Sequence, residues 1–171
     1  MAEVLLRHRL ADLGIDATVA SAGLLQSGQP ASAHGVDILR DRGLDMTTHR
    51  SRTMTREMLR SANLIIAMAR EHVREAVVLD PNLWPRTFTL KELVRRAELA
   101  GPRQVGEPIG DWLARVGHGR RVADLSGSSP TDDVADPIGG PRSAYERMAT
   151  ELDDLLGRFV ALTFAESMSR R

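Results

Sequence analysis

One carboxylate in the sequence could do acid–base chemistry. Asp136 is followed by Pro137, Ile138 and the glycine pair Gly139 and Gly140. A residue before proline is disfavoured in a helix, so Asp136 is expected on a turn, where the glycines let the backbone approach another group closely. A carboxyl held in this way can act as a general acid if partial burial keeps it protonated. The alternative is a turn aspartate that caps the following segment.

Other common catalytic patterns are missing from the sequence. It has no cysteine, which excludes disulfides, thiolate metal sites and a cysteine nucleophile within it. Its five histidines form neither an HExxH motif nor a cluster at ligand spacing. The phosphate-binding patterns GxxxxGK[ST] and GxGxxG and the serine-hydrolase pattern GxSxG do not occur either. We therefore expect no metal and no cofactor.

Composition narrows the class of protein further. The 171 residues suit one domain, and 42% are apolar, enough for a core. The 23 basic residues, all but Lys91 arginine, match 23 acidic ones. A balanced charge argues against nucleic acid and anionic membranes as partners. Without an apolar run long enough to cross a bilayer, we expect a soluble, cytoplasmic protein, and its oligomeric state stays open.

The elements that would position these residues alternate between helix and strand. Apolar spacing and turn residues predict helices and strands at the following positions. Helices are expected at residues 2–13, 32–42, 53–60 or 55–60 (capped by Thr53 or Thr55), 70–79, 91–100, 111–116 and 143–160, and strands at 17–22, 63–68 and 86–89. This order predicts an α/β fold, a three-layer sandwich around a small parallel sheet. We expect a single domain over 1–171, with an elaborated surface loop at about 101–135.

Two helices carry more detailed predictions. Ser32 is expected to cap the helix over 32–42, with Val36, Leu39 and Ala33 facing inward. Ser143 and Glu146 have the spacing of a capping box at the start of the last helix. That helix carries an apolar stripe made of Tyr145, Met148, Leu152, Leu155, Leu156, Phe159 and Val160.

Six separated segments together resemble the low-molecular-weight protein-tyrosine phosphatases, which share their fold with one group of arsenate reductases. The resemblance spans the chain except for about residues 101–131. The matching segments are Met1-Ala2-Glu3 with the LLRHRL that follows shortly after, Ser21-Ala22-Gly23, residues 43–52, residues 62–72, FTLKEL at 88–93, and DPIGG at 136–140 with Tyr145.

The resemblance implies a reaction and a role for one residue. In the family a cysteine thiolate attacks phosphorus and an arginine grips the phosphate, both supplied by a signature loop. The aspartate at the position of Asp136 protonates the leaving oxygen and then activates water. The implied activity is hydrolysis of phosphotyrosine monoesters on a protein substrate, without a metal or cofactor. The implied sheet order is 2-1-3-4.

The sequence departs from this family pattern at its start. It begins where the signature loop would end, so the first strand, the cysteine and the phosphate-gripping arginine are absent, and the chain alone is expected to be inactive. One explanation is a start assigned too late, at the methionine of the motif. The other is a genuine short product that serves as a non-catalytic interaction module. Arsenate reduction is a weaker alternative, because it also needs cysteines.

The residues expected around the substrate ring are aliphatic. Ile138 stands where the family often has tyrosine, and Leu24 and Leu25 follow Gly23. They predict an aliphatic wall around the substrate, although Leu24 and Leu25 could instead be packing residues. His49 and Arg52 are interpreted as structural, tying down the loop before the strand at 63–68.

Overall fold

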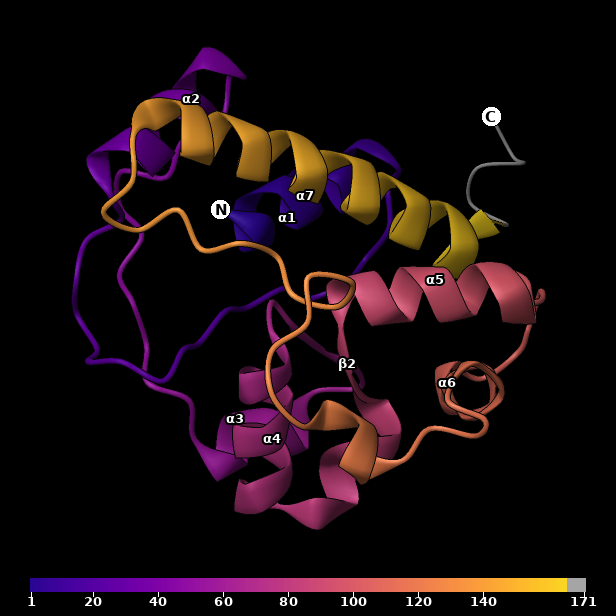
Figure 1. Cartoon of the computed structure of the whole chain (residues 1–171). Coiled ribbons are helices and arrows are strands. Elements are labelled where there is room, and N and C mark those ends of the chain that lie inside the picture. Colours follow the sequence, from indigo (N-terminus) through magenta and orange to yellow (C-terminus); the bar gives the residue numbers. More distant parts are fainter. Residues whose placement is uncertain (166–171) are drawn as a thin grey trace. The chain divides into compact units, whose positions relative to one another are not determined.

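A computed structural model of the chain describes residues 1–165 (Figure 1). Its secondary structure consists of α-helices, two short 3-10 helices (η) and two β-strands. In chain order these are α1 Ala2–Asp12, α2 Ala33–Asp41, α3 Arg56–Ser61, β1 Ile65–Ala67, α4 Arg70–Leu79, η1 Pro81–Arg86, β2 Thr87–Thr89, α5 Leu90–Ala100, α6 Ile109–Val116, η2 Val122–Leu125 and α7 Arg142–Thr163.

The strands form a small parallel sheet. β1 pairs with β2 in the register Ile65 to Thr87, Ile66 to Phe88 and Ala67 to Thr89. The connection runs through α4 and η1, as a parallel pair requires. The predicted α/β class with a small parallel sheet is confirmed, and both strands lie within the ranges expected for them.

Side-chain caps explain where several helices begin. The hydroxyls of Ser32, Thr55 and Thr89 accept hydrogen bonds from backbone N–H groups three residues on, at 3.2–3.3 Å, at the starts of α2, α3 and α5. The expected cap at Ser32 is confirmed. Within α2, Leu39 is buried as expected and Val36 is half-buried, but Ala33 is exposed and Ile38 is buried instead.

The strand predicted at residues 17–22 is wrong. These residues have no strand pairing and are mostly exposed. A strand needs a neighbour for its backbone groups, and side chains of α1 bind this segment instead: Arg7 donates to the Val19 carbonyl and Ser21 donates to Glu3. Backbone pairing starts only at Gly23, in an isolated parallel bridge to Thr53.

The capping box predicted for the last helix is also wrong. α7 begins at Arg142, so Ser143 lies inside its first turn. Glu146 accepts a hydrogen bond from Arg142 Nε at 2.9 Å rather than reaching back to a cap. The apolar stripe of this helix is as predicted, with Tyr145 and Leu156 among its buried members.

The described residues group into two compact units, and α7 contributes to both. Unit 1 comprises Met1–Met54 with Ala135–Gly157, and its core includes Ile38 of α2 packed with Tyr145 and Ala149 of α7. Unit 2 holds the sheet, with Ala67, Val73 and Leu125 in one buried cluster. A single domain over 1–171 therefore stays a prediction.

The segment expected as an elaborated loop carries helical structure. α6 lies where a helix was expected at 111–116, and η2 follows it. Trp112 of α6 is fully buried and its indole N–H donates to the Gly101 carbonyl at 3.1 Å. This bond fixes the turn after α5, where Gly101 has a φ of 85°.

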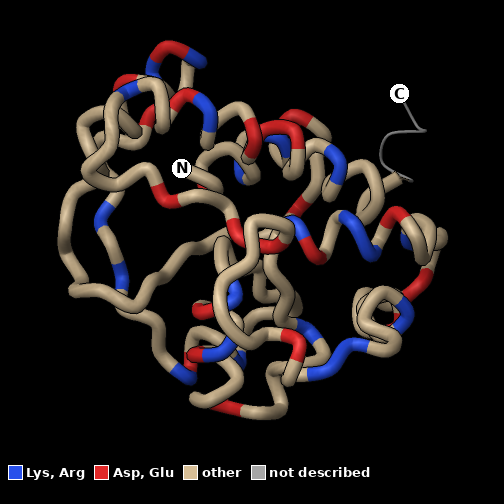
Figure 2. Tube along the Cα trace, in the orientation of Figure 1, with Lys and Arg blue, Asp and Glu red and all other residues tan. Residues whose placement is uncertain are grey.

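Charged residues of both signs are interspersed along the chain (Figure 2). This agrees with the balanced composition. Among residues 1–165, no helix combines the length and the apolar character needed to cross a membrane.

Candidate functional site

Asp136 lies on a turn immediately before α7, as its sequence context predicts. Its Oδ1 accepts a hydrogen bond from the Ile138 backbone N–H at 3.0 Å, and the Gly140 N–H donates to the Pro137 carbonyl at 2.8 Å. Gly139 has a φ of 74°, which glycine adopts without strain. In the described part of the chain, the Ile138 N–H is the only hydrogen-bond donor to this carboxylate. The exposed side chain therefore keeps its second oxygen for another group.

The apolar residues predicted to line the substrate site are exposed. Ile138 is 72% exposed on the Asp136 turn, and Leu24 and Leu25 are 41% and 78% exposed on a separate loop. These side chains are open to a ligand, and the aliphatic wall around the substrate stays a prediction, as does the packing alternative for Leu24 and Leu25.

The loop that carries Leu24 and Leu25 is tied to residues 51–53. Thr53 Oγ1 donates to the Leu25 carbonyl at 3.0 Å, and the Gly28 N–H donates to the Ser51 carbonyl at 2.8 Å. Ser51 Oγ also donates to the Gln26 carbonyl at 2.7 Å. Backbone and hydroxyl contacts thus hold this loop, which leaves the two leucine side chains available for contact.

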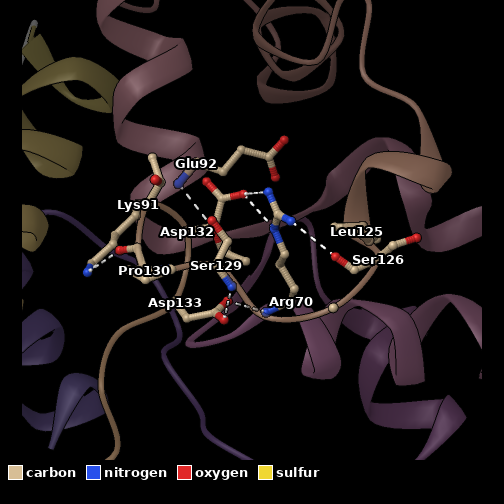
Figure 3. Close-up of polar contacts among 12 residues, drawn as sticks. Arg70, Lys91, Glu92, Leu125, Ser126, Ser129, Pro130, Asp132 and Asp133 are labelled. Atoms are coloured by element: carbon tan, nitrogen blue, oxygen red, sulfur yellow. Dashed lines mark hydrogen bonds and ion pairs between the residues drawn. The ribbon is translucent and has the colours of Figure 1, made fainter.

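The segment just before the Asp136 turn is anchored by two carboxylates, the buried Asp132 and the half-buried Asp133 (Figure 3). Asp132 is 6% exposed and accepts hydrogen bonds at 2.8 Å from Arg70 Nε and Arg95 Nη2. Asp133 accepts from the Arg70 backbone N–H at 2.8 Å and from the Ser129 N–H at 2.7 Å. Residues 129–133 are therefore fixed to the first turn of α4 and to α5.

The two arginines set the ionisation of Asp132. Burial raises the pKa of this carboxyl, but hydrogen bonds and charge from Arg95 and Arg70 outweigh it and hold the pKa below its usual range. Asp132 therefore carries its charge at neutral pH. We call Asp132, Asp133, Arg70 and Arg95 the Asp132 network.

A second carboxylate, Glu3 of α1, gathers polar side chains from distant parts of unit 1. It accepts hydrogen bonds from Arg7 and Ser21, and its Oε2 lies 4.0 Å from both His49 Nδ1 and Arg52 Nη2. Burial raises the pKa of Glu3, yet the hydrogen bonds from Ser21 and Arg7 and the nearby positive charges lower it overall. Glu3 thus ties α1 to residue 21 and to the loop that holds His49 and Arg52.

Sequence reasoning missed Glu3 and Asp132 as organising residues. The spacing of Glu3 and Arg7, four apart on a helix, was a usable signal for that pair. Nothing in the local sequence indicates that residues 21, 49 and 52 meet Glu3. Their convergence depends on tertiary structure.

These residues can supply an acid or a base and can hold anions. Within residues 1–165, no group of three or more histidine, aspartate or glutamate side chains could hold a metal ion. Since the chain has no cysteine, a thiolate nucleophile cannot come from it.

Comparison with known proteins gives a consistent result. The family described as low molecular weight phosphotyrosine protein phosphatase matches residues 1–111. The chain is 28% identical over 141 residues to a protein-arginine-phosphatase of Geobacillus stearothermophilus, covering 82% of this chain and 72% of that protein.

It is also 29% identical over 100 residues to the low molecular weight protein-tyrosine-phosphatase Etp of Escherichia coli K12, covering 58% of this chain and 66% of Etp. The crystal structure of a low molecular weight protein tyrosine phosphatase from T. tengcongensis is similar, with a TM-score of 0.69 and 28% identity. The match covers 93% of this chain and 86% of that one.

Proposed function

Because this chain belongs to the low molecular weight phosphotyrosine protein phosphatase family, we propose that it is the general-acid part of a protein phosphatase that hydrolyses phosphotyrosine monoesters. The observation that carries the proposal is the Asp136 turn, where the Ile138 N–H orients the carboxylate. Because this side chain is exposed in the 171-residue chain, the partial burial that keeps a general acid protonated must come from the bound substrate and the signature loop. Asp136, Pro137 and Gly139 resemble the family's Asp-Pro-Tyr-Gly general-acid loop, with Ile138 in place of its tyrosine.

Asp136 would act on the leaving group. As a cysteine thiolate supplied from outside this sequence bonds to phosphorus, the bond from phosphorus to the tyrosine oxygen breaks, and the protonated Asp136 carboxyl gives its proton to that oxygen. The resulting carboxylate then takes a proton from the water that attacks the cysteinyl phosphate, and cleavage of the S–P bond releases phosphate and restores the thiolate. The Asp132 network supports this role, because it fixes the residues just before the turn.

In our proposal, the nucleophile comes from a part of the protein that lies outside this sequence. The family reaction uses a cysteine, and this chain has none. We therefore expect the 171 residues alone to give no turnover, and a form that begins upstream, with the cysteine loop, to be active. A cytoplasmic location, expected from the sequence, is part of the same proposal.

A second candidate substrate is phosphoarginine. Ile138 replaces the aromatic residue expected beside a phenyl ring, and the relative that covers 82% of this chain is named a protein-arginine-phosphatase. An exposed aliphatic side chain can pack against the methylene stem of an arginine as well as against a ring.

The first experiment compares proteins with different starts. The intact mass of the protein from its own cells would show which start is used, and both forms would be assayed on aryl phosphate, phosphotyrosine peptide and phosphoarginine peptide. We expect turnover only in the form with an upstream cysteine. Turnover by the 171-residue chain that Asp136→Ala abolishes would contradict the need for that loop. A native mass equal to that of this chain, with no turnover, would indicate a binding module.

The second experiment tests the role of Asp136 in the active form. Asp136→Asn should slow turnover by about 10²–10⁴-fold for poor leaving groups and much less for good ones, because only poor ones need the proton. Asp16→Asn is the matched control, since Asp16 is an exposed aspartate elsewhere in unit 1. Equal slowing for good and poor leaving groups would remove the general-acid role.

A further inference from the structure

Unit 1 contains a small polar hollow, and none of the residues that line it belongs to the Asp136 turn. Its volume is about 270 Å³, and residues of α1 and of the loop over residues 45–52 line it. The side chains of Arg7, Arg50 and Arg52 contribute to its wall, with Thr48 and His49 beside them. A space of this size holds a small ion with several waters.

The three arginines keep most of their hydrogen-bonding capacity. Arg7 uses only Nη2, on Glu3 and on the Val19 carbonyl at 2.9 Å. Arg50 uses only Nη1, on the carbonyls of two residues of its own loop at 2.8 and 3.1 Å. The Arg52 guanidinium makes no hydrogen bond within the described part of the chain, and its only polar contact there is an ion pair at 4.0 Å between Nη2 and Glu3 Oε2. The remaining guanidinium N–H groups can therefore donate to a ligand.

The two carboxylates of the wall are already engaged. Glu3 is 9% exposed at its side chain and is occupied by Arg7 and Ser21. Asp45 Oδ1 accepts from the backbone N–H and the hydroxyl of Thr47, at 2.8 and 2.7 Å. With three arginines against two carboxylates, the hollow carries a net positive charge.

We propose that this hollow binds a phosphate-sized oxyanion, held by Arg50 and Arg52, with Arg7 contributing positive charge from the same wall. A guanidinium offers parallel N–H groups that match two oxygens of a phosphate, and two such groups on one loop can hold two edges of it. Arg50 is partly preorganised by its carbonyl contacts, which lowers the entropy lost on binding. The ligand is either free phosphate or the phosphoryl group of a modified side chain.

This inference is independent of the proposed catalytic function. The site uses no residue of the Asp136 turn. Because the 171-residue chain has no cysteine, phosphate binding can be measured on it without turnover. A failure of either proposal therefore leaves the other intact.

The test is a calorimetric titration of the 171-residue chain with inorganic phosphate, at low and at moderate salt. We expect saturable binding that the double variant Arg50→Gln, Arg52→Gln weakens about tenfold or more. The phosphate affinity of Arg50→Lys should fall between those of the wild type and the double variant, since lysine keeps the charge but lacks the parallel N–H groups of a guanidinium. The control is Arg40→Gln: Arg40 is 69% exposed on α2, pairs with Asp37 and lies outside the hollow.

The outcomes separate the alternatives. Tighter binding of a phosphotyrosine peptide than of phosphate would support the site and assign it to a modified side chain, while equal affinities would support it as a site for the free ion. An absence of saturable binding would overturn the proposal, as would an equal loss in Arg40→Gln, which would indicate only general charge attraction. Far-ultraviolet circular dichroism establishes that each variant is folded.

Discussion

At the level of single residues, Glu3 binds more distant partners than any local pattern suggests. It holds Arg7 on its own helix and Ser21 on the following segment, with His49 and Arg52 4.0 Å away. His49 and Arg52 were interpreted as structural residues, and their place beside Glu3 is compatible with that role. Because Glu3 is nearly buried, its charge depends on these partners.

Replacing Glu3 by glutamine tests this dependence. Glu3→Gln should lower the free energy of unfolding by about 1–3 kcal/mol at pH 7, because charged hydrogen bonds are lost. The pKa of Glu3 is lowered in the folded chain, so its contribution is present above the unfolded pKa of about 4.3 and is lost as the pH falls through the folded value. Urea unfolding at pH 7 and pH 3 measures the loss of unfolding free energy and its dependence on pH, with Asp16→Asn as the control. A difference between wild type and variant that persists at pH 3 would argue against an ionic role.

Sequence reasoning reached one part of the site and not the other. The Asp136 turn was predictable because proline and glycine act locally, within five residues. The convergence on Glu3 was not, because residues 3, 21, 49 and 52 meet only after α1 and its neighbouring loops have packed. The same reason hides the hollow beside Arg50 and Arg52.

At the level of elements, the Asp132 network joins a long irregular segment to two helices. Arg70 stands at the start of α4 and Arg95 lies on α5, and both bind the same buried carboxylate. The next residues continue the anchorage, since the Val134 N–H donates to the Met68 carbonyl at 2.8 Å. The segment over 126–134 therefore behaves as part of unit 2.

Removing the charge of Asp132 should loosen this segment selectively. Asp132→Asn leaves two arginines without their anion and should cost about 1–3 kcal/mol. Amide hydrogen exchange should speed up at Val134 and at the Arg70 N–H while the amides of α6 stay protected. The control Asp124→Asn removes an exposed pair with Arg121 and should leave the urea midpoint nearly unchanged. Uniform acceleration across unit 2 would show a global rather than a local effect.

Helices were predicted more accurately than strands for a physical reason. α4 occupies the predicted range, and α5 and α6 begin within two residues of theirs, because caps and apolar spacing are local signals. The segment over 17–22 has strand-like composition but no strand beside it among the described residues. A strand is defined by its neighbour, which composition does not reveal.

At the level of the whole molecule, pairing of charges accounts for the arginine-rich composition better than any one binding surface. Arginines pair with carboxylates in both units, as Arg9 does with Asp153 at 2.8 Å and Arg120 with Glu92 at 2.7 Å. Arg120 is 2% exposed at its side chain and also stacks 3.8 Å from the Phe88 ring centre. Such arginines contribute packing as well as charge.

Acid should therefore destabilise the molecule as a whole. The pKa of Glu3 is lowered in unit 1, and in unit 2 the Arg60 hydrogen bond lowers that of Asp80 as Arg95 and Arg70 lower that of Asp132. Groups with a lowered pKa stabilise the folded chain above their unfolded values, about 4, and this stability is lost as the pH falls through the folded values. The urea midpoint should change little from pH 7 to pH 5 and fall steeply by pH 3.5.

The double variant Glu3→Gln, Asp132→Asn tests whether these two carboxylates cause the loss of stability in acid. It should be less stable than wild type at pH 7 and should lose less stability between pH 7 and pH 3.5, because two of the responsible carboxylates are gone. Since the two carboxylates share no hydrogen-bond partner, their effects should add. If the double variant showed the same steep loss as wild type, the acid response would come from other groups, and general charge repulsion at low pH would be the better explanation.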